Sequence, residues 1–256
     1  MKKFSIPLIV ILIALSIHSS EVLFDSDGIY SLITARYTNA FYISPVVSSQ
    51  IVANNIIDNN STLIVPLSSF QKSYSRHCSI IEAGCSVYAL EDSLPFSVII
   101  SPGQVLLGSF ELSDKKYIRN CFLLHSENRD MISSFSIIAD SLQTRAMAVE
   151  DLGAVRRKDI HRTPGKFVNS MITLRGTVDN IREISGSQMF LLNMQDPVNP
   201  VTIVIFNDIA ESIIASGINP QYFLNSEISV KGVFIDHPRY GYEIILNSPD
   251  NIAITD

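Results

Sequence analysis

The chain has 256 residues, of which 46 % are hydrophobic and 17 % are charged. This balance excludes an intrinsically disordered chain, because disordered segments combine low hydrophobicity with high charge. The formal net charge of −6 excludes a general electrostatic attraction to nucleic acid or to an anionic membrane. A polyanion would therefore have to bind at a local basic patch.

The N-terminus has the layout of an export signal. Lys2 and Lys3 precede an apolar run over residues 4–17, and short polar residues follow up to residue 20. This run is shorter than the roughly 20 residues that a membrane-spanning helix needs. We therefore expect residues 1–20 to be a cleaved signal peptide. The alternative is an uncleaved anchor that attaches the chain to the membrane through residues 4–17. Both interpretations predict a secreted or extracytoplasmic protein, or one anchored to the outer face of the cytoplasmic membrane.

Short apolar strands alternate with helical stretches over residues 21–150, which indicates an α/β layered domain. The sequence predicts helices over residues 28–39, 74–83 and 130–146. It predicts strands over residues 22–24, 41–44, 62–67, 86–90, 97–101, 104–110 and 120–124. A Pro102-Gly103 turn joins two of these strands.

Positive charge is concentrated in one segment near the middle of the chain. Residues 156–166 contain five positive charges and one negative charge, together with the turn signal Pro164-Gly165. We interpret residues 151–166 as a basic linker between two domains.

The helical pattern almost disappears in residues 167–256. The sequence predicts strands over residues 170–178, 188–194, 201–206, 227–235 and 242–246, and one helix over residues 208–216. Five strands with a helix between the third and the fourth is the plan of an OB-fold barrel. We therefore expect an α/β layered domain followed by an all-β five-stranded OB-fold barrel.

One motif in the first domain carries a family resemblance. Residues 98–112 read VIISPGQVLLGSFEL, which resembles the central motif of the phospholipase D-like nuclease and phosphodiesterase superfamily. That motif reads His-x-Lys, four residues, Asp-Gly, an apolar strand, Gly-Ser and then Asn. Gly103, Gly108 and Ser109 fall on its glycine and serine positions, and Asn120 falls on its asparagine. The resemblance implies a phospholipase D-like α/β fold.

The residues that perform the family's chemistry do not match. Its nucleophilic histidine aligns with Pro95, its phosphate-binding lysine with Ser97 and its aspartate with Pro102. Proline supplies neither a nucleophile nor a hydrogen-bond donor. We therefore expect a non-catalytic domain that uses no cofactor. The alternative is an active extracytoplasmic nuclease or phosphodiesterase that has recruited His77 or His125.

The resemblance covers residues 21–146 and includes one copy of the motif. The family's chemistry needs two copies that face each other, so the resemblance implies a homodimer through this domain as one option.

Cysteines and histidines of the first domain suggest two other sites. Cys78, Cys85 and Cys121 could form one disulfide, with Cys85–Cys121 as the leading pair, or remain three thiols. His77 and His125 could join two of these cysteines around a metal. No pair has C-x-x-C or H-x-x-x-H spacing, so the sequence predicts no metal site.

The second domain resembles OB-fold nucleic-acid-binding families of the anticodon-binding or helicase-associated type. The residues that carry this resemblance are 165–168, 172–178, 201–206, 228–232 and 242–246. Single-stranded binding uses aromatic faces and a basic groove. The candidate nucleic-acid-binding residues are Arg175, Arg182, Phe190, Phe206, Arg239 and Tyr240. Tyr240 beside Arg239 in a loop is the leading stacking candidate, whereas Phe190 and Phe206 could instead belong to the core.

These observations lead to three functional hypotheses. The first is an exported or anchored, non-catalytic protein that binds single-stranded nucleic acid, or a similar polymer, through its OB-fold. The second is the active hydrolase described above. The third is a structural module of the cell envelope that makes protein contacts.

Overall fold

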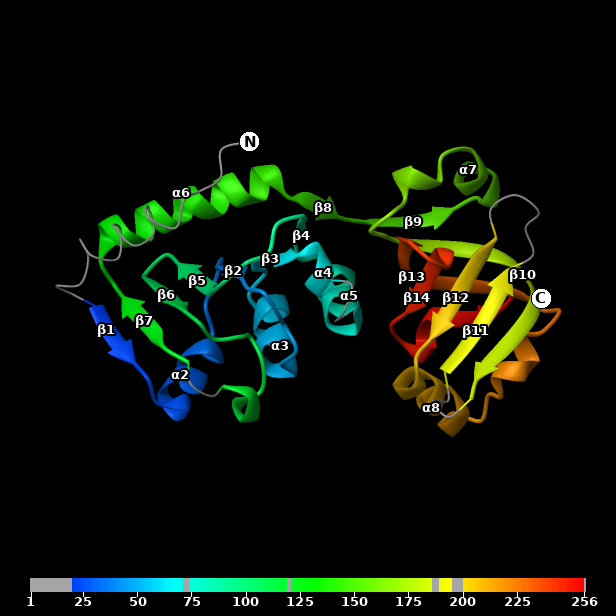
Figure 1. Cartoon of the computed structure of the whole chain (residues 1–256), viewed down its shortest axis with the longest axis horizontal. Coiled ribbons are helices and arrows are strands. Elements are labelled where there is room, and N and C mark those ends of the chain that lie inside the picture. Colours follow the sequence, from blue (N-terminus) through cyan, green and yellow to red (C-terminus); the bar gives the residue numbers. More distant parts are fainter. Residues whose placement is uncertain (1–19, 71–73, 119–120, 186–188, 195–199, 256) are drawn as a thin grey trace. The chain divides into compact units, whose positions relative to one another are not determined.

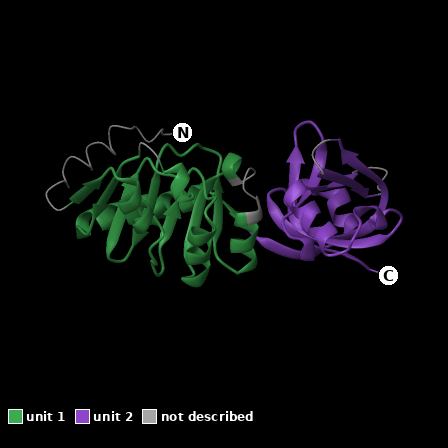
Figure 2. Cartoon of the chain, turned by 90° about the horizontal axis from the view of Figure 1, so that it is seen from below, with its two compact units in different colours: residues 1–148 green, residues 149–256 purple. Residues whose placement is uncertain are grey.

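The computed structural model describes residues 20–70, 74–118, 121–185, 189–194 and 200–255. The predicted signal segment up to residue 19 lies outside the described residues, and so does Asn120. The chain forms two compact units, residues 1–148 and residues 149–256 (Figure 2). No helix within the described part of the chain is both long and apolar enough to cross a membrane.

The first unit contains one mixed sheet covered by helices (Figure 1). Its strands are β1 (Ser20–Leu23), β2 (Phe41–Ile43), β3 (Thr62–Pro66), β4 (Val87–Leu90), β5 (Ser97–Ser101), β6 (Gln104–Gly108), β7 (Leu123–Ser126) and β8 (Met147–Val149). Its helices are α2 (Ser26–Ile33), α3 (Gln50–Asp58), α4 (Leu67–Phe70), α5 (Tyr74–Glu82) and α6 (Arg129–Arg145), with a 3-10 turn η2 at Lys115–Tyr117.

The strand order in this sheet is β1-β7-β6-β5-β2-β3-β4-β8. Strands β2, β3 and β4 run parallel, whereas β5 pairs antiparallel with both β2 and β6. Every residue of β5 is buried, which explains its continuous Val-Ile-Ile run. Together these pairings give an α/β sheet with an antiparallel flank.

Helix α6 covers one face of this sheet because its apolar residues recur at helical spacing. Met131, Phe135 and Ala139 are buried in a cluster with side chains of β5 and β6. The helix begins after Asn128, whose side chain accepts hydrogen bonds from the backbone N–H groups of Asp130 (2.9 Å) and Met131 (3.2 Å).

Two helices differ from the sequence prediction. Helix α2 begins at Ser26 and ends at Ile33, so it is shorter than the predicted 28–39. Asp25 caps its start by accepting a hydrogen bond from the Gly28 N–H at 2.5 Å. Helix α3 was not predicted, because the asparagines and β-branched residues of its sequence QIVANNIID have a low helix propensity. It forms because Val52, Ala53 and Ile56 become fully buried.

The second unit consists mainly of strands. They are β9 (Asp151–Val155), β10 (Ser170–Ile184), β11 (Met189–Met194), β12 (Val201–Ile205), β13 (Glu227–His237), β14 (Gly241–Leu246) and β15 (Ile252–Ile254). The helices are α7 (Arg157–Arg162) and α8 (Asn207–Ala215), and the 3-10 turns are η3 (Pro164–Lys166), η4 (Pro220–Phe223) and η5 (Pro249–Asn251).

Strand pairings in this unit return to the strand where they begin. β10 pairs with β11, β11 with β12, β12 with β14, β14 with β13, and β13 with β10. The circuit is possible because β10 is long: Ser170–Thr177 pair with β13, and Val178–Ile184 pair with β11 across a register shift. The sequence prediction ended this strand at residue 178.

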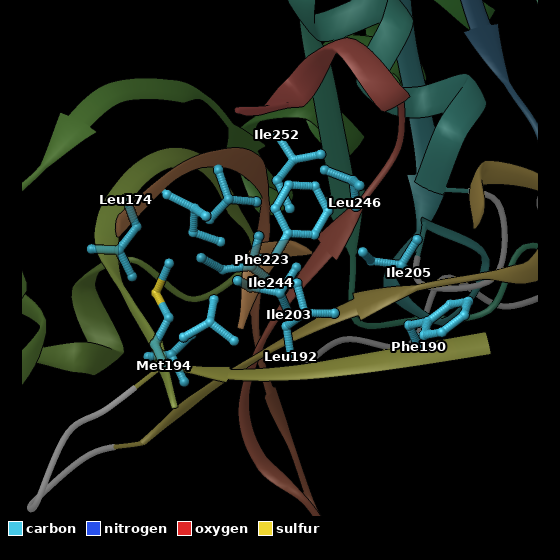
Figure 3. Close-up of a cluster of buried hydrophobic side chains, with 14 of the residues drawn as sticks. Leu174, Phe190, Leu192, Met194, Ile203, Ile205, Phe223, Ile244, Leu246 and Ile252 are labelled. Carbon is cyan, nitrogen blue, oxygen red and sulfur yellow. The ribbon is translucent and has the colours of Figure 1, made fainter. Parts of the chain in front are cut away.

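Alternate side chains of the circuit point inward and form the core of the second unit. Figure 3 labels members of this cluster from β10, β11, β12 and β14, together with Phe223 from η4 and Ile252 from β15. Leu192 and Ile203 are fully buried, and Phe190 is 5 % exposed. The period-2 alternation of β11 thus arises from one buried face, whereas β12 is buried on both faces from Ile203 to Ile205.

The segment predicted as a basic linker, residues 151–166, folds as part of the second unit instead. Its first residues form β9, which pairs parallel with β10, and the following residues form α7 and η3. Ile160 is buried in the core. Asp151 and Lys231 form an ion pair at 2.8 Å. The many charged side chains of this segment favour a linker in the sequence. In the structure, the apolar side chain of Ile160 packs α7 against the core.

The Gly108→Ala substitution should destabilise the first unit. A Cβ atom at Gly108 would overlap the Phe122 carbonyl oxygen and lie 2.8 Å from a ring carbon of Phe110. Because backbone cannot move as a flexible side chain does, we expect a loss of about 1–3 kcal/mol in the free energy of unfolding. Gly103→Ala is the control, since nothing lies within 4 Å of its Cβ position. Equal thermal unfolding of the two variants, followed by circular dichroism, would contradict this packing.

Candidate functional site

The first candidate site lies where β5 begins, at the lysine position of the phospholipase D-like motif. Ser97 is fully buried there and stands opposite Gly108 of β6. The Ser97 hydroxyl donates a hydrogen bond to the Phe110 carbonyl at 2.6 Å and lies 2.8 Å from the hydroxyl oxygen of Ser44. The position therefore holds a neutral, internally bonded hydroxyl pair, which cannot neutralise a phosphate as lysine would.

Some of the other motif residues lie next to Ser97, and others do not. Pro95 is exposed just before β5, and Pro102 is exposed in the turn at its other end. About 23 Å of extended chain separates the two prolines. Gly108 and Ser109 lie next to Ser97 by the strand register, and the Ser109 hydroxyl accepts a hydrogen bond from the Phe122 N–H at 3.2 Å. The structure therefore groups half of the motif around Ser97.

The two histidines of the hydrolase alternative lie on separate elements. His77 is fully buried in α5, and His125 lies in β7 opposite Leu106. In the described part of the chain, neither is a hydrogen-bond partner of Ser97 or Ser44. No group of three His, Cys, Asp or Glu side chains among the described residues could hold a metal ion.

The three cysteines form no disulfide with one another in the described residues. Cys78 and Cys85 are buried, and Cys121 is half-buried. Burial raises the pKa of the Cys85 thiol, which makes this group a poor nucleophile.

The second candidate site is the tip of the hairpin that joins β13 to β14. His237 pairs with Gly241, and Pro238, Arg239 and Tyr240 form the tip. The Tyr240 side chain is 59 % exposed, and its ring stacks on the His237 ring with centroids 4.6 Å apart. The Arg239 guanidinium lies 5.4 Å from the centroid of the same ring. Gly241 closes the turn with a positive φ of 80°.

His237 holds this tip in place through its ring nitrogen. Its Nδ1 accepts hydrogen bonds from the backbone N–H groups of Arg239 and Tyr240, each at 3.2 Å. These two bonds tie the side chain of His237 to the backbone of the turn. The stacked tyrosine and the adjacent cation therefore have a fixed geometry. An exposed aromatic face beside a guanidinium can stack on a base or on another flat group.

The two phenylalanine candidates have different environments. Phe190 is 5 % exposed and belongs to the core cluster, so the structure corrects its prediction as a stacking residue. Its inward orientation follows from its place in β11, where Leu192 and Met194 share the same buried face. Phe206 is 42 % exposed and precedes α8.

The arginine candidates lie at three separate places. Arg175 stands opposite Ser229 of β13, whereas Arg182 stands opposite Leu191 of β11. About 23 Å of β10 separates the first two arginines. Arg239 lies beyond the far end of β13. The fold therefore does not collect these cations into one groove.

The outward face of β11 and β12 is neutral. Its side chains are Leu191 and Asn193 from β11 and Thr202 and Val204 from β12. The Thr202 hydroxyl donates a hydrogen bond to Asn193 Oδ1 at 3.0 Å. Thr202 also pairs with Glu243 of β14, where burial raises the pKa of the carboxyl group and the nearby His237 opposes this shift. The face itself carries no aromatic ring, and one cation borders it, because Arg182 of β10 stands opposite Leu191.

A small pocket of about 250 Å³ lies at the end of α8. Its lining is mainly apolar and consists of Phe190, Ile214, Gly217, Ile218, Asn219 and Pro220. It contains no charged side chain to orient a ligand.

Comparisons with solved structures find low similarity to nucleases. Nuc from Salmonella typhimurium, a phospholipase D family member, is 13 % identical with a TM-score of 0.44, covering 52 % of this chain and 98 % of Nuc. NucT from Helicobacter pylori is 12 % identical with a TM-score of 0.42, covering 50 % of this chain and 97 % of NucT. Each match covers about half of this chain and almost all of the other chain.

A third structure is a protein described as an aspartyl-tRNA synthetase from Leishmania major Friedlin. It is 12 % identical with a TM-score of 0.29, and the match covers 40 % of this chain and 20 % of the synthetase. No protein family model matches the chain, and no curated protein matches it. All three TM-scores are below 0.5.

The Ser97→Ala substitution tests the hydroxyl pair directly. It removes the hydrogen-bond donor of the buried Phe110 carbonyl, so we expect a loss of about 1–2 kcal/mol in the free energy of unfolding, measured in urea. Ser93→Ala is the control because Ser93 is exposed in the loop before β5. Equal unfolding midpoints for the two variants would contradict the structural role given to Ser97.

Proposed function

We propose that this chain is a non-catalytic binding protein whose second unit is an OB-fold barrel for single-stranded nucleic acid. In the same proposal, the first unit is a phospholipase D-like scaffold without its catalytic residues. Residues 1–20 export the chain or anchor it to the outer face of the membrane.

The strand circuit of the second unit supports the barrel. Counting β10 to β14 as strands one to five, the circuit runs 1-2-3-5-4-1, and α8 lies between the third and the fourth strand. Strands three and five, β12 and β14, pair in parallel. The predicted OB-fold plan has the same number of strands and the same helix position.

The hairpin tip carries the ligand proposal. Tyr240 presents an exposed ring that His237 and Arg239 already hold in place, so little conformational entropy is lost when a base stacks on it. The hairpin joins strands four and five, which is one of the loops that OB-folds use for oligonucleotides.

The strand ends beside this tip carry Asp236 and Glu243, so we expect weak, stacking-dominated binding. Each phosphate contact on a single strand contributes a slope of about −0.7 to the dependence of log K on log salt. With Arg239 as the cation beside Tyr240, we expect a shallow slope that corresponds to one or two contacts. A steep salt dependence would instead require the cations at Arg175 and Arg182 to act together, which their separation opposes.

The lack of catalysis rests on the start of β5. Ser97 is buried and bonded to Phe110, and prolines stand where the family has its histidine and aspartate. A nucleophile for phosphorus is therefore missing from the motif.

A second candidate function is a protein-contact module of the cell envelope. The observation that favours it is the outward row of β11, where the partly exposed Leu191 and Asn193 carry no charge. Such a face fits a partner protein better than a polyanion.

Binding of a fluorescently labelled single-stranded oligonucleotide, followed by anisotropy at low salt, tests the nucleic-acid proposal. Tyr240→Ala should weaken binding by about 1–3 kcal/mol, the usual contribution of one base stacked on an aromatic ring. Tyr222→Ala is the matched control, since Tyr222 is also a surface tyrosine of the second unit, 64 % exposed in η4.

The labelled oligonucleotide should remain intact throughout the titration. Unchanged affinity in Tyr240→Ala would contradict the stacking site, and cleavage by the purified protein would contradict the non-catalytic scaffold. If the unaltered chain fails to bind at low salt, the nucleic-acid proposal is wrong and the protein-contact function remains.

A further inference from the structure

Three exposed apolar side chains meet at the edge of the first unit's sheet. In the antiparallel register of β1 and β7, Val22 stands opposite Leu124 and Leu23 opposite Leu123. Continued by one residue, this register sets Phe24 opposite Phe122. Val22 and Phe24 are two residues apart on an extended chain, so they share one face. We call Val22, Phe24 and Phe122 the edge patch.

The edge patch is unusually open for its composition. Phe24 is 74 % exposed, Val22 46 % and Phe122 42 %. Isolated apolar side chains on a surface are ordinary, but two neighbouring phenylalanines at the end of an edge strand form a contiguous patch that indicates a contact. Strand β1 is the last strand on this side of the sheet.

An aromatic residue with a lysine lies in the chain segment that leads to the patch. Tyr117 of η2, five residues before Phe122, is 60 % exposed, and the Lys116 ammonium lies 4.8 Å from its ring centroid. An ion pair of 2.5 Å between Lys115 and Asp27 ties η2 to the start of α2, three residues after Phe24. Tyrosine and lysine side chains with an apolar body and a polar end suit the region between lipid headgroups and acyl chains.

The position of the apolar N-terminal run indicates what covers the patch. Residues 4–17 end three residues before Ser20, where β1 begins. Phe24 lies about 13 Å of extended chain beyond Ser20. If residues 4–17 insert into a bilayer, the short connection holds β1 close to the headgroups. The mixed charges beside the patch, Asp27 with Lys115, fit zwitterionic lipids better than a strongly anionic surface.

We propose that the edge patch is a membrane-contacting surface that seats the first unit on the lipid interface beside the N-terminal anchor. The inference rests on the anchoring part of the proposed function and is independent of oligonucleotide binding. Its partner is the phosphatidylcholine-like interface of a bilayer, into which Phe24 and Phe122 insert shallowly.

Single-tryptophan reporters in the full chain test this surface, because the sequence contains no tryptophan. Phe122→Trp and Tyr117→Trp place a reporter at or near the patch, far in sequence from the anchor. Ile51→Trp is the control, since Ile51 is 48 % exposed on α3. This helix joins β2 to β3, and β2 lies about 19 Å from β1 across the sheet. The chain is reconstituted in phosphatidylcholine vesicles with or without brominated acyl chains, and the emission spectra are compared.

The expected result is a blue shift and a loss of intensity with brominated lipid for the Phe122→Trp and Tyr117→Trp reporters, and neither change for Ile51→Trp. Co-flotation of the chain with unquenched patch reporters would overturn the surface while supporting the anchor. Failure to co-float would overturn both the anchor and the surface. A blue shift of the patch reporters without vesicles would show that another segment or a second copy covers the patch, which also overturns the inference.

Oligonucleotide binding measured on the same preparations keeps the two proposals separate. Tyr240 lies in the second unit, so loss of binding in Tyr240→Ala should leave the quenching of the Phe122→Trp reporter unchanged.

Discussion

The closed circuit of the second unit depends on one long strand that has two partners in it. Strand β10 pairs with β13 along its first half and with β11 along its second half, and the register shifts between Val178 and Asn180. A bulge of this kind bends the strand and increases its twist. Without the bend, β11 and β13 could not both reach β10, and the inward side chains would not meet in one core. Gly232 of β13 allows β14 to lie close to β13, because a Cβ at this position would overlap the carbonyl oxygen of Ile245.

The closed circuit determines which side chains are available for binding. It turns Phe190, Leu192 and Met194 into the core and leaves a neutral outward face on β11 and β12. Among the described residues of the second unit, an aromatic ring and a cation lie together in the loop between β13 and β14, at His237, Arg239 and Tyr240. In the first unit, packing has a different consequence, because Ser97 at the start of β5 uses its hydroxyl for internal bonding.

Local patterns in the sequence were enough to predict most strands. The Val-Ile-Ile run of β5 and the Pro102-Gly103 turn predict a hairpin that the structure contains, because both signals are local. Helix α3 was not predicted because its asparagines lower the local helix propensity, and the helix forms through tertiary packing of its buried residues. The basic segment 151–166 was misassigned because charge dominates its composition, whereas Ile160 decides its packing.

The candidate sites were less predictable because they depend on non-local register. The orientation of Phe190 follows from which face of β11 closes on the core, and a sequence that allows both faces does not decide it. The pairing of β1 with β7 joins residues about a hundred positions apart, so no local signal could reveal the edge patch. Tyr240 and Arg239 were identified because their relation is local, within one turn.

The central claim is that the β13–β14 hairpin is the contact point of the second unit for a single-stranded oligonucleotide. Backbone amide chemical shifts of the 15N-labelled protein, recorded during titration with a short oligonucleotide, test it most directly. The account predicts that the largest shift changes fall on residues 237–241, with smaller changes at the adjoining ends of β13 and β14. Changes centred on Arg175 or on α8, with the hairpin unaffected, would contradict it.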